Sequence, residues 1–286
     1  MALENSLVAK KTTFSTFITS DAIKNKVNQM VAGRDGAKFI TSLISLVSNN
    51  PMLAECEHST ILSSALLGES LKLSPSPQLG QFYMVPFNDK KNSRKVAQFQ
   101  IGYKGYIQLA MRSGQYRDLD VIEVRQGEYK GKDPFTGKAR VEFIEDDNER
   151  LKLPVIGYFA YFELLNGFRK SLYWTKEKME KHALTYSQAY KTDINKGWNM
   201  SFWSKDFDDM AFKTMLRQLI SKWGIMSIEF QTAFTHDMGV IDNEGNVNFV
   251  DSVNDTPQEI KTLPPSNDTN SDTIIENNDP LNNFEE

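Results

Sequence analysis

Basic and aromatic side chains alternate along residues 82–117, although the chain as a whole carries a formal net charge of −4. This stretch holds seven basic residues, seven aromatic residues and a single acid, Asp89. Single-stranded nucleic acid calls for this combination, because cations bind phosphates and rings offer faces on which bases stack. A basic surface over buried core aromatics would give the same pattern. The basic residues are Lys90, Lys91, Arg94, Lys95, Lys104, Arg112 and Arg117.

A second region of this kind covers residues 169–222, with eleven bases against six acids. Lys213 and Arg217 are four residues apart, so they share one face of the helix expected there, apart from the apolar stripe through Met210. An ordinary solvated face is the alternative. Two such regions favour a groove with two basic walls. Further members are Tyr186, Tyr190, Lys191, Lys196, Trp198, Trp203 and Lys205.

The net charge divides unevenly along the chain. Residues 251–286 hold nine acids and one lysine, which leaves a mildly basic body. An acidic tail that competes for a basic groove fits this division, as does a disordered, solubilising tail. Cys56 is the single cysteine, which excludes an intrachain disulfide and suits a reducing compartment. No apolar run is long enough to span a membrane and no secretory signal is recognisable, so we expect a cytoplasmic protein.

Hydrophobic periodicity predicts an α+β fold, with an antiparallel β-sheet containing hairpins and helices on both sides of the strand block. The Asn166-Gly167 pair is a strong hairpin signal. We expect a flexible segment over 1–33, a DNA-binding core over 34–235 and an acidic, disordered tail over 236–286. Strands are predicted over 81–87, 96–102, 118–125, 139–145, 155–164 and 168–174. Helices are predicted over 22–31, 37–48, 59–72, 104–113, 176–189 and 205–222, with a loop over 191–199.

Two motifs were weighed for bond chemistry. GKDPFTGKA at 131–139 is the nearest match to a phosphate-binding loop. It has five residues between its glycines instead of four, lacks the Ser or Thr after the lysine, and lies between strands, so we expect no nucleotide cofactor. Asp206, Asp208 and Asp209 could hold Mg²⁺ in a nuclease, but acids also gather at helix N-termini for electrostatic reasons. The scattered histidines and one cysteine make a zinc site improbable.

Three blocks resemble the RecT family of phage and prophage single-strand annealing proteins, of which the phage lambda beta protein is a more distant relative. They are ALLGESLKLSPSPQLGQFYMVPF (65–87), FQIGYKGYIQLAMRSGQYR (99–117) and FWSKDFDDMAFKTMLRQLISKWG (202–224). The resemblance covers residues 37–235. It implies an ATP-independent protein without bond chemistry that coats single-stranded DNA, pairs it with a complementary strand, and forms rings or filaments.

The resemblance also implies partners and contacts. The partners are single-stranded DNA, the annealed duplex intermediate, further copies of the chain, a phage exonuclease and the host single-strand-binding protein. Trp203 is assigned to the core, and Trp198 either to base stacking or to the core. The DNA contacts implied by similarity are Lys90, Lys91, Arg94, Lys95, Tyr103, Lys104, Lys191, Lys196, Lys205, Lys213 and Arg217. The basic and aromatic pattern adds Arg112, Arg117, Tyr186 and Trp198.

Three alternatives remain open from the residues themselves. One is a passive single-strand-binding protein that coats DNA without pairing it. Another is a metal-dependent nuclease built on the aspartate cluster. The third is a structural phage protein with an incidental basic face.

Overall fold

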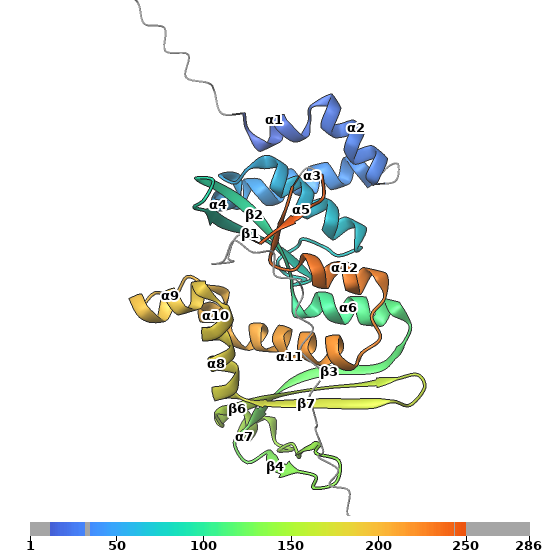
Figure 1. Cartoon of the computed structure of the whole chain (residues 1–286), viewed down its shortest axis with the longest axis vertical. Coiled ribbons are helices and arrows are strands. Elements are labelled where there is room, and N and C mark those ends of the chain that lie inside the picture. Colours follow the sequence, from blue (N-terminus) through green and yellow to red (C-terminus); the bar gives the residue numbers. More distant parts are fainter. Residues whose placement is uncertain (1–11, 32–34, 243, 250–286) are drawn as a thin grey trace, which may run out of the picture. The chain divides into compact units, whose positions relative to one another are not determined.

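The computed structural model describes residues 12–31, 35–242 and 244–249, and it confirms the α+β class (Figure 1). Its strands pair antiparallel throughout, and helices flank them on both sides. The strands form three sheets of four, three and two strands instead of one sheet. Residues 250–286 of the expected acidic tail lie outside the described residues.

The four-stranded sheet has the order β1-β2-β8-β9. Helix α5 lies along β2, where its Thr60 Oγ1 accepts a hydrogen bond from Ala97 N at 2.9 Å. Side chains of α5 thus satisfy part of the β2 edge that β8 does not reach. The strands are β1 (Phe82–Asp89), β2 (Arg94–Ile101), β8 (Gly239–Ile241) and β9 (Val247–Asn248). The helices on this side are α1 (Phe14–Ile18), α2 (Asp21–Met30), α3 (Asp35–Ser48), α4 (Pro51–Ala54) and α5 (His58–Ser70).

The three-stranded sheet has the order β3-β6-β7, and a separate hairpin is formed by β4 and β5. The predicted turn at Asn166-Gly167 is confirmed, with Gly167 at φ +84°. The strands are β3 (Tyr116–Arg125), β4 (Tyr129–Lys132), β5 (Ala139–Val141), β6 (Val155–Leu164) and β7 (Arg169–Thr175). The remaining helices are α6 (Tyr103–Ser113), α7 (Asp147–Lys152), α8 (Lys176–Tyr186), α9 (Gln188–Lys196), α10 (Phe202–Lys205), α11 (Phe207–Trp223) and α12 (Ile228–His236).

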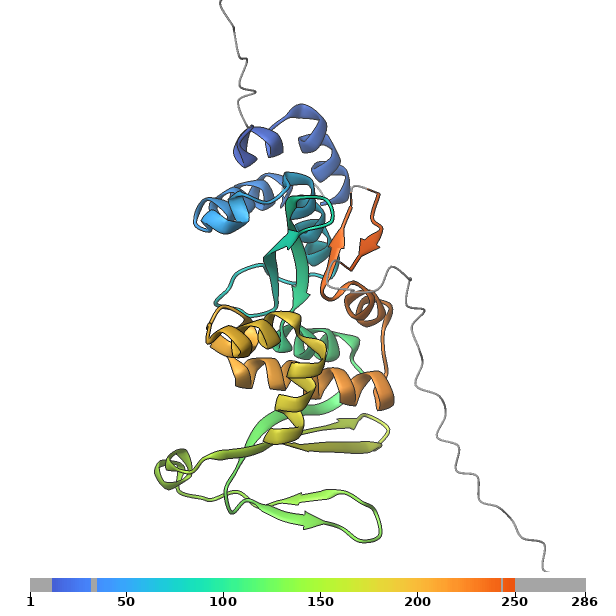
Figure 2. The same cartoon turned by 60° about the vertical axis from the view of Figure 1, so that its left-hand side comes forward.

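Helices α6 and α11 lie between the two larger sheets, as Figures 1 and 2 both show. The apolar side of α11, including Met215 and Leu219, is fully buried against the three-stranded sheet and α6. Tyr106 of α6 stacks on Phe230 of α12 at a centroid distance of 6.3 Å. One continuous core therefore holds the sheets and the helices between them. Among the helices within the described ranges, none is long and apolar enough to cross a membrane.

Three expectations differ from the structure. The segment 1–33 contains, besides the helix predicted over 22–31, the unpredicted helix α1, which buries Phe14 and Ile18. The segment 236–286 begins with β8, which pairs with β2 through Val240 opposite Gln98. The loop expected over 191–199 is helical through Lys196. Helices of five residues and strands of three are too short to leave a periodic pattern, so only tertiary contacts reveal them.

Candidate nucleic-acid interface

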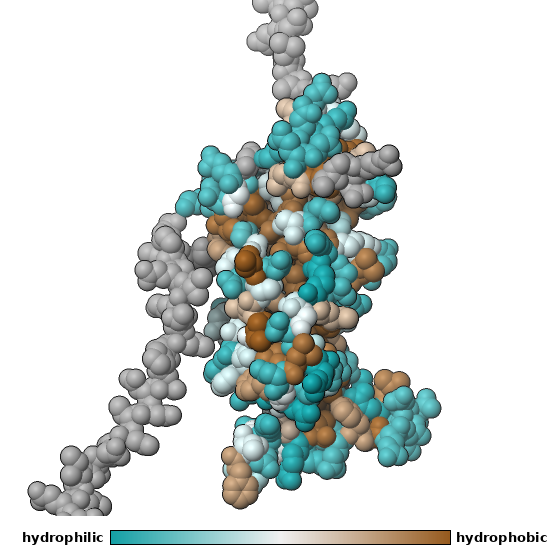
Figure 3. Space-filling model, turned by 90° about the vertical axis from the view of Figure 1, so that its right-hand side faces the viewer, coloured by the Kyte–Doolittle hydropathy of each residue, from teal (hydrophilic) through white to brown (hydrophobic). Residues whose placement is uncertain are grey.

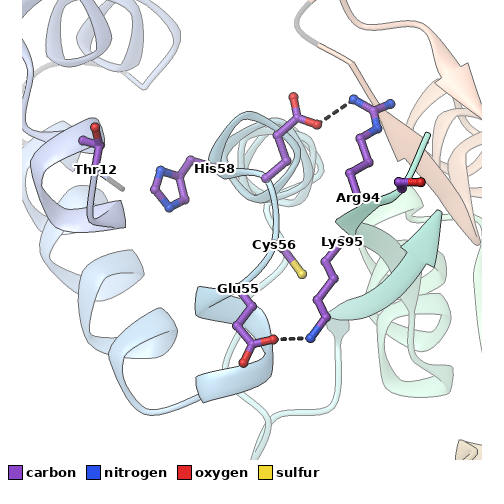
Figure 4. A pocket seen from close by; sticks show the side chains of 8 residues that line it. Thr12, Glu55, Cys56, His58, Arg94 and Lys95 are labelled. Carbon is purple, nitrogen blue, oxygen red and sulfur yellow. Dashed lines mark hydrogen bonds and ion pairs between the residues drawn. The ribbon is translucent and has the colours of Figure 1, made fainter. Parts of the chain in front are cut away.

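The β1–β2 hairpin tip, residues 90–95, holds four of the predicted cations, and two of these form ion pairs with carboxylates. Arg94 Nη1 lies 2.6 Å from Glu57 Oε2, and its Nε lies 3.2 Å from Asp89 Oδ2. Lys95 pairs with Glu55 on the same side (Figure 4). Hydrogen bonds from Asn92 and Arg94 hold the pKa of Asp89 below its usual range. The tip is therefore partly neutralised by its own neighbours, while Lys90 and Lys91 are exposed.

A hollow of about 620 Å³ beside this tip is lined by Cys56, His58 and Lys95 among others (Figure 4). Burial raises the pKa of the Cys56 thiol to about 11. A thiol with that pKa is protonated at neutral pH, so it is neither a nucleophile nor a ready metal ligand. The hollow offers no nucleophilic site.

Arg112 and Arg117 hold secondary structure together. Arg112 donates to the carbonyls of Leu71 at 2.6 Å and Lys72 at 2.9 Å, which end helix α5. Arg117 Nη1 lies 2.8 Å from Glu163 Oε1. Arg112 and Arg117 are both exposed, but their guanidinium groups bind carbonyl and carboxylate groups of the protein itself.

Lys213 on α11 does not lie on an open face as expected, because it is buried against Asp237, whereas the side chain of Arg217 is 37% exposed. Lys213 Nζ lies 2.9 Å from Asp237 Oδ1, and Lys213 is only 6% exposed. Arg217 Nη1 lies 3.0 Å from Asp237 Oδ2 and donates to Tyr106 Oη at 3.1 Å. Burial lowers the pKa of Lys213 despite the neighbouring carboxylate. The two cations share a helix face as predicted, but that face meets the α12–β8 connection.

A cleft runs along the outer edge of β1. Its larger part, about 1230 Å³, lies between α3, α4, the loop after α5 and β1. Its smaller part, about 240 Å³, reaches the starts of α6 and α11. The two parts share Pro77, Tyr83 and Phe202, and the rings of Tyr83 and Phe202 are 5.9 Å apart. We call the whole hollow the β1 cleft.

The predicted residues Tyr103 and Lys104 lie at the end of the β1 cleft. Tyr103 lines its smaller part and packs edge-on against Phe212 at 5.5 Å. Lys104 is exposed, with its Nζ 5.7 Å from the Tyr103 ring. Asp206 and Asp209 line the same end. Burial, together with the charge of Asp206, raises the pKa of Asp209. This end of the cleft is therefore less favourable for phosphate than the rest.

Rings and cations alternate along the outside of helix α8. Lys178, His182 and Tyr186 follow one another at intervals of four residues, which places them on one face of α8, and Trp174 at the end of β7 lies beside this face. The ring of His182 lies 5.4 Å from Trp174 and 4.6 Å from Tyr186. Lys178 Nζ sits 4.2 Å above the Trp174 ring. Burial and Lys178 lower the pKa of His182, so at neutral pH the imidazole is an uncharged ring.

The next helix, α9, packs on α8 and ends in the same kind of pair. Lys196 Nζ lies 4.3 Å above the ring of Trp198, which is 53% exposed. Lys191 is exposed on α9, and Tyr186 at the end of α8 is 74% exposed. We call the row formed by Trp174, Lys178, His182, Tyr186, Lys191, Lys196 and Trp198 the α8–α9 strip. Trp203 is buried, as predicted.

A buried aspartate joins the α8–α9 strip to the β1 cleft. Asp193 of α9 accepts hydrogen bonds from Met200 N at 2.9 Å, Ser201 N at 2.7 Å and Ser204 Oγ at 2.7 Å. These bonds lower the pKa of Asp193 to about 2. They fix the segment between Trp198 and Phe202, and Phe202 and Lys205 both lie on the short helix α10 that follows. Asp193 thus connects the segment after Trp198, at the end of the strip, to the helix that carries Phe202 of the cleft.

The aspartate cluster at the start of α11 does not form a metal centre. Asp208 accepts a hydrogen bond from the buried Tyr158, and Asp208 and Asp209 occupy the first turn of the helix. Within the described part of the chain, no three His, Cys, Asp or Glu side chains are grouped to hold a metal ion. The acids match the preference of a helix N-terminus for negative charge.

The opposite side of the body, seen in Figure 3, shows hydrophobic residues interspersed with hydrophilic ones. Scattered exposed apolar residues are ordinary on a protein surface.

Sequence comparison gives this surface a family context. The sequence model of the RecT family matches residues 37–249, a span that runs from α3 through β9. The uncharacterized protein YqaK of Bacillus subtilis (strain 168) is 36% identical over 253 residues, covering 88% of this chain and 80% of YqaK. Protein RecT of Escherichia coli (strain K12) is 30% identical over 191 residues, covering 65% of each chain. The chain therefore belongs to the RecT family.

Proposed function

We propose that this protein binds single-stranded DNA and anneals complementary strands as an oligomer, without hydrolysing a nucleotide. Membership of the RecT family supports a role in recombination and single-strand annealing. The observation that carries the proposal is the α8–α9 strip, where Lys178 and Lys196 lie over the rings of Trp174 and Trp198. Alternating rings and cations suit a strand whose bases stack and whose phosphates need counterions.

The mechanism needs no bond to be made or broken. Two single strands repel each other through their phosphates, so short pairings fall apart. Lysines along the strip neutralise the first strand, while the rings of Tyr186 and Trp198 hold bases by stacking. A second strand is then selected by base pairing, since contacts to phosphates and ring faces carry little sequence information. Modest affinity for each subunit adds up across linked subunits.

The DNA contacts are proposed on the basis of exposure. Lys90, Lys91, Lys104 and Lys205 are exposed and border the hairpin tip or the cleft, so they belong to the proposed contacts with the strip. Lys213 and Arg217 form ion pairs with Asp237, and we propose that they stabilise the fold. A phage exonuclease and the host single-strand-binding protein are proposed partners, supported by the family resemblance alone.

The test is an annealing reaction with two complementary, fluorescently labelled oligonucleotides, in EDTA and without ATP. Faster pairing than in the protein-free reaction supports the proposal, and a non-complementary pair serves as the control. Binding without faster pairing indicates a passive single-strand-binding protein. Degradation of the strands when Mg²⁺ replaces EDTA indicates a nuclease.

A further inference from the structure

The turn between β4 and β5 presents a single phenylalanine to solvent. Phe135 lies at the tip of this turn and is 96% exposed. Its neighbours Pro134, Thr136 and Gly137 are exposed too, so no apolar cluster surrounds the ring. Single exposed apolar residues are ordinary on a protein surface, so the exposure of Phe135 matters only together with the rigid turn and the lysines around it.

Hydrogen bonds make the turn rigid. Asp133 Oδ1 accepts from Phe135 N at 3.1 Å, from Thr136 N at 2.7 Å and from Thr136 Oγ1 at 2.9 Å. Asp133 N donates to the Lys138 carbonyl at 2.8 Å, and Gly137 turns the chain back with φ +65°. These bonds lower the pKa of Asp133. The ring of Phe135 is therefore held on a preorganised support.

The base of the hairpin is anchored to the body. Glu128 is completely buried and lies 2.6 Å from Arg150 Nε. The ring of Tyr129 stacks on Tyr173 of β7 at 4.4 Å, with an interplanar angle of 10°. Glu142 N, just after β5, donates to the Glu128 carbonyl at 3.0 Å, so both strands of the hairpin are held at its base, and the hairpin projects from the body in Figure 2.

Positive charge surrounds the exposed ring. Lys130, Lys132, Lys138 and Arg140 are exposed on the hairpin, and Lys130 Nζ lies 3.9 Å from Glu142 Oε2. Burial lowers the pKa of Lys178, and the like charge of Lys132 lowers it further. The charges of Lys132 and Lys178 therefore repel each other, and a polyanion bound near both would relieve this repulsion.

We propose that Phe135 is an intercalating side chain, which enters between two neighbouring bases of DNA bound along the α8–α9 strip while the hairpin lysines contact the flanking phosphates. The inference rests on the proposed function. The lysines and the arginine on the hairpin favour DNA over a protein partner. The cores of protein interfaces are depleted of charged residues, whereas charged residues lie around Phe135. Apolar wedges of this kind unstack a base step and lengthen or bend the DNA.

The test uses the full chain and oligonucleotides that carry one 2-aminopurine at successive positions, a base whose fluorescence rises when it is unstacked. We expect the annealed complex to show raised fluorescence at some positions with the unaltered protein and with Phe135→Trp, which keeps a ring. Phe135→Ala should lose this rise and bind about tenfold more weakly. Phe143→Ala, an exposed phenylalanine at the base of the hairpin, is the matched control and should behave as the unaltered protein.

Two results would overturn the inference. The first is a Phe135→Ala protein that binds DNA normally with the same fluorescence rise. The second is a loss of self-association in the absence of DNA, measured by sedimentation, which would show that the ring docks on another copy. If the unaltered chain binds no DNA, the proposed function fails. If the unaltered chain binds DNA and Phe135→Ala behaves in the same way, the inference alone fails.

Discussion

The β1–β2 hairpin tip and the α8–α9 strip are both cationic, but they hold their charges differently. At the tip, Arg94 and Lys95 lie against the carboxylates of Glu57 and Glu55. On the strip, Lys178 and Lys196 lie over tryptophan rings. A carboxylate neutralises a lysine before DNA arrives, whereas a ring leaves its charge available to a phosphate. The difference teaches that the partner of a cation matters: acid-paired cations are already neutralised within the fold, and the ring-paired cations of the strip are therefore the proposed DNA contacts.

The largest effect is expected where two acid-paired cations are buried. Asp237→Ala leaves Lys213 as a buried charge without its carboxylate and removes a partner from Arg217. We expect the free energy of unfolding to fall by about 3–5 kcal/mol, measured by urea denaturation. Glu244→Ala, an exposed acid nearby, is the control. A loss below about 1 kcal/mol for Asp237→Ala would show that this network does not hold α11 in place.

A large effect on DNA binding, with little effect on stability, is expected for the exposed rings of the strip. Tyr186→Ala with Trp198→Ala should weaken single-strand binding at least tenfold, because stacking on one base contributes about 1–3 kcal/mol. The measurement is fluorescence anisotropy of a labelled oligonucleotide. Phe168→Ala, a 44% exposed phenylalanine on the β6–β7 turn, is the control. Equal losses for the strip and control proteins would separate the strip from the DNA site.

A moderate, pH-dependent effect is expected at Asp193. Its folded pKa of about 2 lies below the ordinary value near 3.9, so its ionised form stabilises the fold. This contribution is fully present above about pH 4 and is lost as pH falls toward 2. Asp193→Asn should therefore be less stable than the unaltered protein at pH 7, and the difference should shrink in acid. Thermal unfolding at several pH values measures it, and a difference that does not change with pH would contradict the assignment.

The smallest effect is expected at the hairpin tip. Arg94 and Lys95 are each 45% exposed at their side chains, and exposed ion pairs contribute at most about 1 kcal/mol each. Arg94→Ala with Lys95→Ala should thus unfold close to the unaltered protein in urea. A loss of several kcal/mol would mean that the tip is a structural anchor of the four-stranded sheet.

Local signals in the sequence predicted much of the fold. Asn166-Gly167 produced the expected hairpin, Gly114 ends α6 in the left-handed region, and Thr175 caps α8 through a hydrogen bond from Lys178 N. Each of these features depends on residues next to one another in the chain. Where a contact joins distant segments, the sequence could not show it, and Asp237 is the example: it lies in a stretch without periodicity and yet covers Lys213.

The candidate site was only partly predictable for the same reason. Lys178, His182 and Tyr186 repeat every four residues within the predicted helix, so the part of the strip on α8 could have been predicted from the sequence. The pair of Tyr83 and Phe202 in the β1 cleft could not, because these residues meet only through the tertiary fold. The motif at 131–139 lies in the turn between β4 and β5, as expected from the sequence, but the exposure of Phe135 became visible only in the structure.

The most direct test of the central claim removes the same charge from the two regions. Lys191→Ala with Lys196→Ala on the strip and Arg94→Ala with Lys95→Ala at the tip each delete two positive charges. Single-strand affinity is measured for both proteins over a range of salt concentrations. The strip protein should lose about 1.4 from the log–log salt slope, about 0.7 for each phosphate contact, and anneal more slowly, while the tip protein keeps both properties. An equal or greater loss for the tip protein would contradict the account.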